Sequence, residues 1–155
     1  MELQKVKKLA KAAAKRPILQ CLHYKDDEIT FTDSYVLVIE RNSIKVEKPL
    51  VISMVNGKMY EGTYPDTSKI RPAEEDLVRV NDWYLELRPF KEPYYIADGV
   101  RFQKSKVEDA LACLGLKPFG DQVIPNLFIK KQGQMLVYDN WDNGQYVLIL
   151  GVRVD

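Results

Sequence analysis

The chain has 155 residues, of which 46% are hydrophobic and 29% charged, and its formal net charge is +1. A chain of this length can bury roughly two-thirds of its unfolded surface in one domain, and this apolar content excludes intrinsic disorder. Because the chain is nearly neutral, it has no global field that attracts nucleic acid, so any electrostatic role must come from local clusters of charge.

Targeting and membrane signals point to a cytoplasmic protein. No run approaches the roughly 20 apolar residues of a membrane span, so we expect no membrane partner. The apolar stretch at residues 9–14 is short for a signal-peptide core and is interrupted by Lys11. Cys21 and Cys113 lie in apolar stretches without metal-ligand spacing. Buried, reduced thiols are typical of the cytoplasm, which is the location we expect.

Residues 2–16 are predicted to form an amphipathic helix. Alanine, leucine and lysine dominate the segment and favour helix, and its apolar residues recur at helical spacing. These apolar positions are Leu3, Val6, Ala10 and Ala13. Pro17 should end the helix, because a proline forces the residue before it towards extended geometry.

Strands are predicted after this helix, separated by turn residues. Three apolar segments are typical of strands, at residues 18–24, 29–32 and 35–40. A further strand, or a pair of edge strands around Pro49, is predicted within residues 44–54.

Residues 54–98 are rich in proline, tyrosine and charge, and they carry Asn-Gly and Asp-Gly turn signals at Asn56 and Asp98. They lack an apolar pattern large enough for a separate core. We therefore expect an elaborated connector, in which residues 78–87 add one or two strands.

The second helix is predicted to begin at Ser105. Ser105 and Glu108 have the spacing of a capping box, in which the two side chains satisfy reciprocal backbone donors. An apolar stripe follows at Val107, Ala110, Leu111 and Leu114, and Gly115 is suitably placed to cap the end. Strands are then predicted at residues 123–131, 135–139 and 146–154.

The two halves of the chain repeat one another. The segment YVLVI at residues 35–39 recurs as YVLIL at 146–150, and LQK at residues 3–5 recurs as FQK at 102–104. A repeated unit in so short a chain predicts internal pseudo-symmetry. We expect one α+β domain over residues 1–155, with two helix-plus-three-strand units (1–53 and 99–155), antiparallel sheets and a connector at 54–98.

This order of elements resembles one domain of the bacterial sliding clamp, the β subunit of the replicative DNA polymerase. The segments RPIL at residues 16–19 and DEITFT at 27–32 are similar to the clamp strands that follow its first helix. YPD at 64–66 with IRP at 70–72 is similar to the family's F-P-D-Y-x-x-V-x-P segment. The end of the chain, YVLILGVRV at 146–154, is similar to the clamp's closing Y-V-V-M-P-M-R-L.

A stripe of lysines on the first predicted helix is the strongest electrostatic feature. Lys5, Lys8, Lys11 and Lys15 fall within an arc of roughly 120° opposite the apolar face. Such a stripe suits contact with phosphates without reading of bases, and clamp helices face duplex DNA, so the resemblance implies DNA binding here. The alternative is a solvated helix face. The flanking cations proposed with the stripe are Arg16, Lys104 and Lys106, although Glu108 and Asp109 weaken the second helix's signal.

The resemblance also implies a partner-binding site near the end of the chain. In clamps, a hydrophobic cleft near this tail captures short peptides from polymerases and other replication proteins. Leu150, Val152, Arg153 and Val154 match the family's positions there, while Gly151 replaces its proline. The alternative is that this segment is simply a core strand.

Catalysis is not expected, and neither is a metal or cofactor. Residues 139–144 begin like a calcium loop, but Trp141 occupies a ligand position, so a hairpin turn explains them better. Cys21 and His23 could share a strand face, yet no orienting third group is evident, so we interpret them as packing.

Two functions remain open on the sequence. One is a DNA-encircling processivity factor, which would require a homo-oligomer because one domain cannot encircle a duplex. The other is a monomeric or dimeric module that binds or interferes with replication proteins such as a DNA polymerase, a role that would suit a phage or mobile element. An enzyme ranks last.

Overall fold

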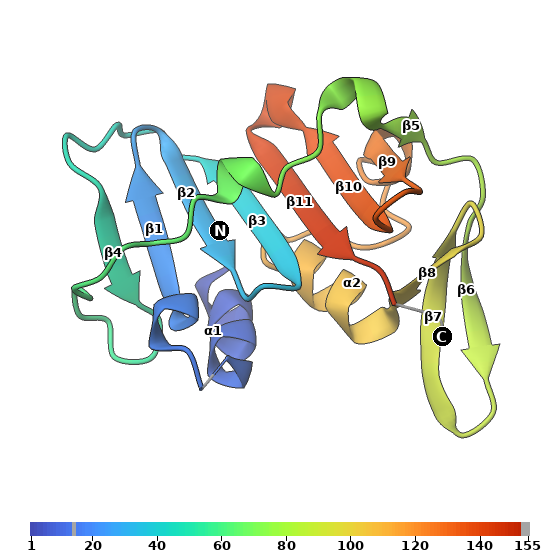
Figure 1. Ribbon diagram of the computed structural model, residues 1–155, viewed down its shortest axis with the longest axis horizontal. Coiled ribbons are helices and arrows are strands. Elements are labelled where there is room, and N and C mark those ends of the chain that lie inside the picture. The colour runs from blue at the N-terminus through green and yellow to red at the C-terminus, as the bar shows by residue number, and fades with distance from the viewer. Residues whose placement is uncertain (14, 153–155) are drawn as a thin grey trace.

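In the computed structural model, described at residues 1–13 and 15–152, the two units build one antiparallel sheet (Figure 1). Its strand order is β4-β1-β2-β3-β11-β10-β9-β5, and a second sheet has the order β6-β7-β8. The strands are β1 (Cys21–Lys25), β2 (Glu28–Thr32), β3 (Val36–Arg41), β4 (Leu50–Ser53), β5 (Val78–Arg79), β6 (Trp83–Arg88), β7 (Lys91–Ala97), β8 (Val100–Gln103), β9 (Leu127–Lys130), β10 (Met135–Asn140) and β11 (Gln145–Leu150). The α-helices are α1 (Leu3–Ala12) and α2 (Lys104–Ala112), and short 3-10 helices lie at Pro17–Gln20, Thr67–Lys69, Glu74–Asp76, Ile124–Asn126 and Trp141–Asn143.

The predicted pseudo-symmetry is confirmed. α1 with β1, β2 and β3 corresponds to α2 with β9, β10 and β11. The two units meet where β3 pairs with β11 in antiparallel register, with Val38 opposite Val147. The repeated YVLVI and YVLIL segments therefore supply the two central strands, and both helices lie on one face of the sheet.

Both faces of these central strands are buried, which explains why the repeated segments are apolar without alternation. Val36, Val38 and Val147 point to the helical side and join the main core. Leu37 and Leu148 point to the other side and form a second cluster with neighbours on β10 and β11.

The connector covers that second side. Figure 1 shows it crossing the near face of the sheet before it reaches β5, while α1 and α2 lie behind. Tyr64 anchors the crossing, because it is 7% exposed and its hydroxyl accepts the Thr32 N–H at 2.9 Å. Further along, Arg71 lies over the ring of Tyr146 at 4.4 Å from the ring centre. The prediction of strands within residues 78–87 is confirmed by β5 and the start of β6.

The first helix is shorter than predicted. It ends at Ala12, four residues before the expected end at Arg16, and a 3-10 helix at Pro17–Gln20 replaces the start of the predicted strand 18–24. Its last buried residue is Ala10. Without further apolar burial there is little to stabilise another turn, because packing supplies most of a helix's stability.

The capping box predicted at Ser105 is wrong. α2 begins one residue earlier, at Lys104, and Glu92 on β7 serves as the acceptor: its carboxylate accepts the Ser105 N–H and the Gln103 side-chain amide, both at 2.7 Å. Glu108 instead bonds Lys104 and Tyr95. A carboxylate from another strand thus satisfies the helix N-terminus.

Other boundaries differ where prolines intervene. The prediction at 44–54 yields only β4, since Pro49 lies outside it, and β9 starts after a 3-10 helix that contains Pro125. The C-terminal end of α2 follows the prediction: Gly115 has φ +70°, its N–H reaches Ala112 O, and Leu116 N–H reaches Leu111 O. This is the Schellman pattern, in which glycine adopts the left-handed conformation without strain.

Candidate functional site

The lysines of α1 lie on the surface that faces away from the sheet. Lys5, Lys8 and Lys11 are exposed, as are Lys15 and Arg16 beyond the end of the helix. Segments 2–16 and 104–112 together contain eight Lys and Arg residues but only three Asp and Glu residues. The whole chain contains 23 Lys and Arg residues and 22 Asp and Glu residues. The helical layer therefore carries the molecule's surplus of positive charge, although the chain as a whole is nearly neutral.

Part of this charge is neutralised within the layer. Lys8 Nζ lies 3.1 Å from Asp109 Oδ1 on α2, and Lys104 Nζ lies 2.7 Å from Glu108 Oε1. The bond to Glu108 raises the pKa of Lys104. Partial burial works against ionisation of Glu108, but hydrogen bonds from Lys104 and Tyr95 hold the pKa of Glu108 below its usual value. Lys8 on α1 and Lys104 on α2 are thus each compensated by a carboxylate of α2.

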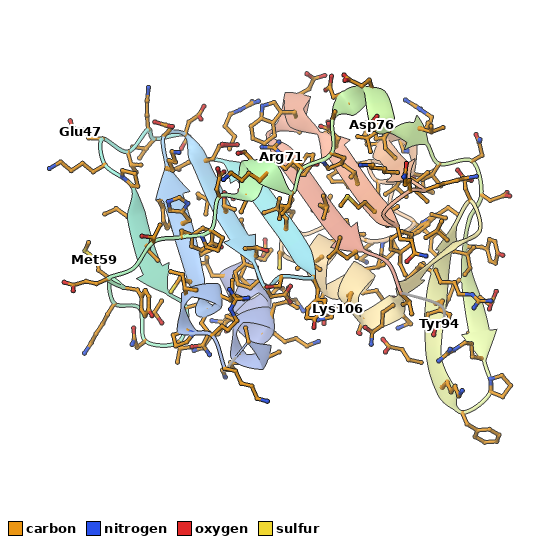
Figure 2. The ribbon with its side chains drawn as sticks, in the orientation of Figure 1. Glu47, Met59, Arg71, Asp76, Tyr94 and Lys106 are labelled. Atoms are coloured by element: carbon orange, nitrogen blue, oxygen red, sulfur yellow. The ribbon has the colours of Figure 1, made fainter. Side chains whose placement is uncertain are left out.

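Lys106, the other predicted cation of α2, belongs to a cluster at the turn between β2 and β3. Lys106 Nζ lies 3.7 Å from Asp33 Oδ2 and 4.7 Å from the centre of the Tyr35 ring (labelled Lys106 in Figure 2). Arg16 Nη1 donates to Ser34 Oγ at 3.3 Å. The other Asp33 oxygen accepts the N–H groups of Tyr35 and Val36, each at 2.9 Å, which fixes the turn that carries the Tyr35 ring.

A pocket of about 340 Å³ lies on the connector side of the sheet, and Leu150 lines it. Leu148 and Leu150 are two residues apart on β11 and so share a face, while Met135 pairs with Leu150 from β10. Ile70 and Pro72 close the pocket from the connector. The rest of its lining comes from the β2–β3 turn and from cations at the rim, namely Thr32, Ser34, Tyr35, Val36, Lys69, Arg71 and Lys130.

The connector is held over the sheet at this point by Arg71. Its guanidinium covers the Tyr146 ring and lies 3.9 Å from Glu28 Oε1 (labelled Arg71 in Figure 2). Ile70, the residue before it, remains 44% exposed. Ile70 and Arg71 both line the Leu150 pocket, so the connector contributes an apolar side chain and a cation to it.

The remaining residues of the predicted partner site are placed differently. Val152 N–H donates to Arg101 O on β8 at 2.9 Å, and Gly151 N–H donates to Gln134 O at 2.7 Å, so the chain turns from β11 towards the second sheet. Val152 is not among the residues that line the Leu150 pocket in the described part of the chain. Arg153 and Val154 lie outside the described residues.

Sequence reasoning missed the contribution of the connector to this pocket. The segments at 64–66 and 70–72 resemble a clamp segment, but the sequence alone does not indicate a role for them. The available signal was Ile70, a lone large apolar residue between charged neighbours. The sequence does not predict its position, because packing the connector over β11 joins segments that are far apart in the chain.

A second pocket, of about 410 Å³, lies beside the first on the helical side of the β2–β3 turn. Lys15, Arg16 and Lys106 line it. Ser34 and Tyr35 line both pockets, so one turn separates an apolar hollow from a basic one.

The residues interpreted as packing are engaged in packing. His23 stacks on Tyr64 with 4.7 Å between ring centres, and Cys21 Sγ donates to Pro17 O at 3.4 Å. Burial raises the pKa of the Cys113 thiol to about 12 and also raises that of Cys21. Asp139 and Asn140 end β10, and residues 141–144 form the turn into β11, with Gly144 at φ +69°, so the predicted hairpin turn is confirmed.

The described residues, 1–13 and 15–152, hold neither a metal-binding cluster nor a membrane-spanning helix. They contain no group of three or more His, Cys, Asp or Glu side chains arranged to hold a metal ion. Within the same residues, no helix has both the length and the apolar character needed to cross a membrane.

Solved bacterial sliding clamps share this fold. The DNA polymerase III β subunit of Borrelia burgdorferi superimposes with a TM-score of 0.58 and 13% identity, over 100% of this chain and 64% of that one. The β chain of Streptococcus pneumoniae DNA polymerase III superimposes with a TM-score of 0.55 and 16% identity, over 99% of this chain and 64% of that one. The Bacillus subtilis DNA polymerase sliding clamp superimposes with a TM-score of 0.55 and 16% identity, over 98% of this chain and 63% of that one.

These matches establish that the chain has the α+β fold of a sliding-clamp domain, as the motifs predicted. The chain spans about 64% of the length of the clamps it matches. No protein-family model and no curated protein matches the sequence.

Proposed function

We propose that this protein is a non-catalytic accessory factor of DNA replication that captures short apolar peptides of replication proteins, such as a DNA polymerase. The observation that carries the proposal is the Leu150 pocket, an apolar hollow with a cationic rim on a fold shared with DNA polymerase clamps. The residues that the clamp resemblance pointed to and the hollow in the sheet coincide at Leu150.

The pocket suits a peptide rather than a folded surface. Its volume of about 340 Å³ accommodates one or two large side chains. Burying each such side chain gains about 1.5–3 kcal/mol, from which the ordering of a flexible segment must be subtracted. We therefore expect dissociation constants of roughly micromolar size for a peptide with two apolar anchors.

Fluorescence anisotropy with labelled nine-residue peptides tests this. Peptides with two adjacent large apolar residues should bind, and the same peptides with serine at both positions should not. Leu150→Asp should weaken binding at least about tenfold, because it places a charge in the apolar floor. Ile124→Asp, at an exposed apolar residue outside the pocket, is the matched control and should bind normally. Equal binding by both variants would reject the site.

We also propose that the outer face of α1, together with Lys15 and Arg16 just beyond its end, contacts duplex DNA without sequence specificity. Lys5, Lys11, Lys15 and Arg16 are exposed, and no salt bridge engages them among the described residues. Flexible ammonium groups neutralise phosphates and release counterions, so binding should weaken steeply as salt rises. Lys8, Lys104 and Lys106 contribute less, because each has a carboxylate partner.

Replacing Lys5, Lys11 and Lys15 with glutamine tests the DNA face. The slope of log binding constant against log salt should fall by about 2.7 if all three contact phosphates. Glutamine at Lys45, Lys48 and Lys58 removes the same charge from exposed positions away from the helices. If both triple variants lower the slope equally, net charge rather than α1 is responsible and the proposed face is wrong.

Between the two architectures left open by the sequence, the edges of the eight-stranded sheet favour the interaction module over a ring joined through that sheet. The outer side of β4 is occupied by the chain itself, since Ser53 N–H donates to Lys58 O at 2.9 Å and Tyr60 N–H to Val51 O at 2.8 Å. At the opposite edge, β5 spans only Val78–Arg79. Covered and very short edges are poor templates for pairing with another chain.

Sedimentation velocity distinguishes the two architectures. The module predicts a species near the 17.9 kDa mass of one chain, or a dimer, at micromolar concentration. A discrete oligomer of ring size, and its retention on circular but not linear DNA, would instead support encirclement.

A further inference from the structure

The Leu150 pocket and the basic pocket meet at the β2–β3 turn, and the Tyr35 ring stands between them. Tyr35 is 59% exposed and lines both, as does Ser34. Because the two pockets share this wall, a chain segment that fills the apolar pocket and continues past Tyr35 comes within reach of the basic one.

The basic pocket carries more positive than negative charge, and two of its cations are already oriented. Lys106 is fixed between the Tyr35 ring and Asp33, and Arg16 is held by Ser34. Lys15 adds a third cation. Asp33 supplies the opposing carboxylate, but it is 7% exposed and one of its oxygens already accepts two backbone N–H groups. Positive charge is thus left for a ligand.

We propose that this pocket binds a carboxylate side chain next to the apolar anchors of the captured peptide, so that the preferred ligand is an acidic–apolar segment. The inference rests on the proposed peptide-binding function. A carboxylate that enters here gains charge-assisted hydrogen bonds from guanidinium and ammonium groups. Because two of the cations are held before binding, less side-chain freedom is lost on capture.

The pocket suits a peptide carboxylate better than a DNA phosphate. Ala12, Ala13 and Leu19 line it together with the cations, so its walls are partly apolar. A duplex presents its phosphates on a broad convex surface, which matches the exposed outer face of α1 more closely than a hollow of about 410 Å³.

Three labelled peptides test the inference. They share one apolar core and differ on one flank, which carries two glutamates, two glutamines or two lysines. At 50 mM salt, the glutamate peptide should bind about tenfold more tightly than the glutamine peptide, and the lysine peptide more weakly than both. At 300 mM salt the preference should shrink to about threefold or less, because the pocket is open to solvent.

Variants locate the preference. Arg16→Gln and Lys106→Gln should each bring the glutamate-to-glutamine ratio towards one while leaving the affinity for the glutamine peptide unchanged. Arg16 is exposed, so that variant tests the pocket even if Lys106→Gln disturbs the turn. Lys5→Gln removes an equal charge elsewhere on the helical layer and should preserve the ratio.

The outcomes separate this inference from the function beneath it. Equal affinity for the glutamate and glutamine peptides would overturn the acidic preference and leave peptide capture intact. Failure of all three peptides to bind would reject peptide capture itself. If Arg16→Gln weakens duplex DNA binding but not the glutamate peptide, the pocket serves phosphates and the inference is wrong.

Discussion

α1 and α2 occupy corresponding places on one sheet, yet they present different chemistry to solvent. Val6 and Ala10 on α1, like Val107 and Ala110 on α2, are fully buried in the same core. On the outside, α1 exposes lysines that mostly lack carboxylate partners, whereas Lys104 on α2 is paired with Glu108. The comparison teaches that the duplicated interior constrains the scaffold, while the surface of each unit is free to specialise.

The two helices also begin differently. The N-terminus of α1 has no side-chain cap, although Glu2 N–H donates to Cys113 O beside α2. The N-terminus of α2 is bound by the Glu92 carboxylate from the second sheet. One helix therefore depends on the connector for its first turn and the other does not.

The largest change in stability is expected when a buried phenylalanine of either unit is truncated, and comparing the two units tests whether both support the core equally. Phe31 on β2 and Phe102 on β8 are both 0% exposed and belong to the same core. Phe31→Ala and Phe102→Ala should each lower the free energy of unfolding by about 3–5 kcal/mol, from lost burial and the cavity left behind. Urea denaturation followed by circular dichroism measures both.

Phe90→Ala is the matched control for this pair, because Phe90 is fully exposed at the tip of the β6–β7 hairpin. It should change the free energy of unfolding by less than about 0.5 kcal/mol. A loss that is large for one buried phenylalanine and negligible for the other would show that the two units do not share one cooperative core.

A smaller effect is expected at the helix starts. Glu92→Gln keeps the shape of the side chain but removes the charge that faces the N-terminus of α2, and it should cost about 1 kcal/mol of unfolding free energy. Glu2→Gln at the start of α1 should cost less than about 0.5 kcal/mol, since no side-chain cap is lost there. If the two variants lose the same unfolding free energy, the two helix N-termini are not stabilised differently and the comparison is wrong.

The same carboxylate should affect stability in acid. Hydrogen bonds from Ser105 and Gln103 hold the pKa of Glu92 below its usual value. A group whose pKa is depressed by folding stabilises the native state above its unfolded pKa of about 4.3, and this contribution is lost as the pH falls through the folded value. Melting curves between pH 6 and pH 3 should therefore fall less steeply for Glu92→Gln than for the parent protein. If the melting temperature of Glu92→Gln falls with pH as steeply as that of the parent protein, Glu92 is not the group whose depressed pKa stabilises the fold.

The smallest effect is expected for the contact between the helices. The Lys8–Asp109 pair is exposed on the lysine side, so a double-mutant cycle with alanine should give a coupling energy of about 0.2–1 kcal/mol, diminishing with salt. Lys5 with Asp109 serves as the reference pair and should give none. A coupling well above 1 kcal/mol would mean that this pair, and not the shared core, joins the two helices.

The sequence revealed much of this architecture because its signals are local. The repeat at residues 35–39 and 146–150 predicted two corresponding strands, and the lysine spacing of α1 predicted its exposed face; that the two strands pair with each other is seen only in the structure. The candidate site was only partly visible. Leu150 was found through the clamp motif, but Ile70, Pro72 and the neighbouring basic pocket were not.

What the sequence determined by itself is whatever a short window encodes: hydrophobic period, turn residues, the repeat and the glycine that ends α2. The tertiary structure alone decided which distant groups meet. Glu92 caps a helix that Ser105 was expected to cap, the connector packs over β11, and Asp33 pairs with Lys106. Those contacts depend on how segments far apart in the chain are packed, and the free energy that selects them comes from burial of the whole core, which no local pattern contains.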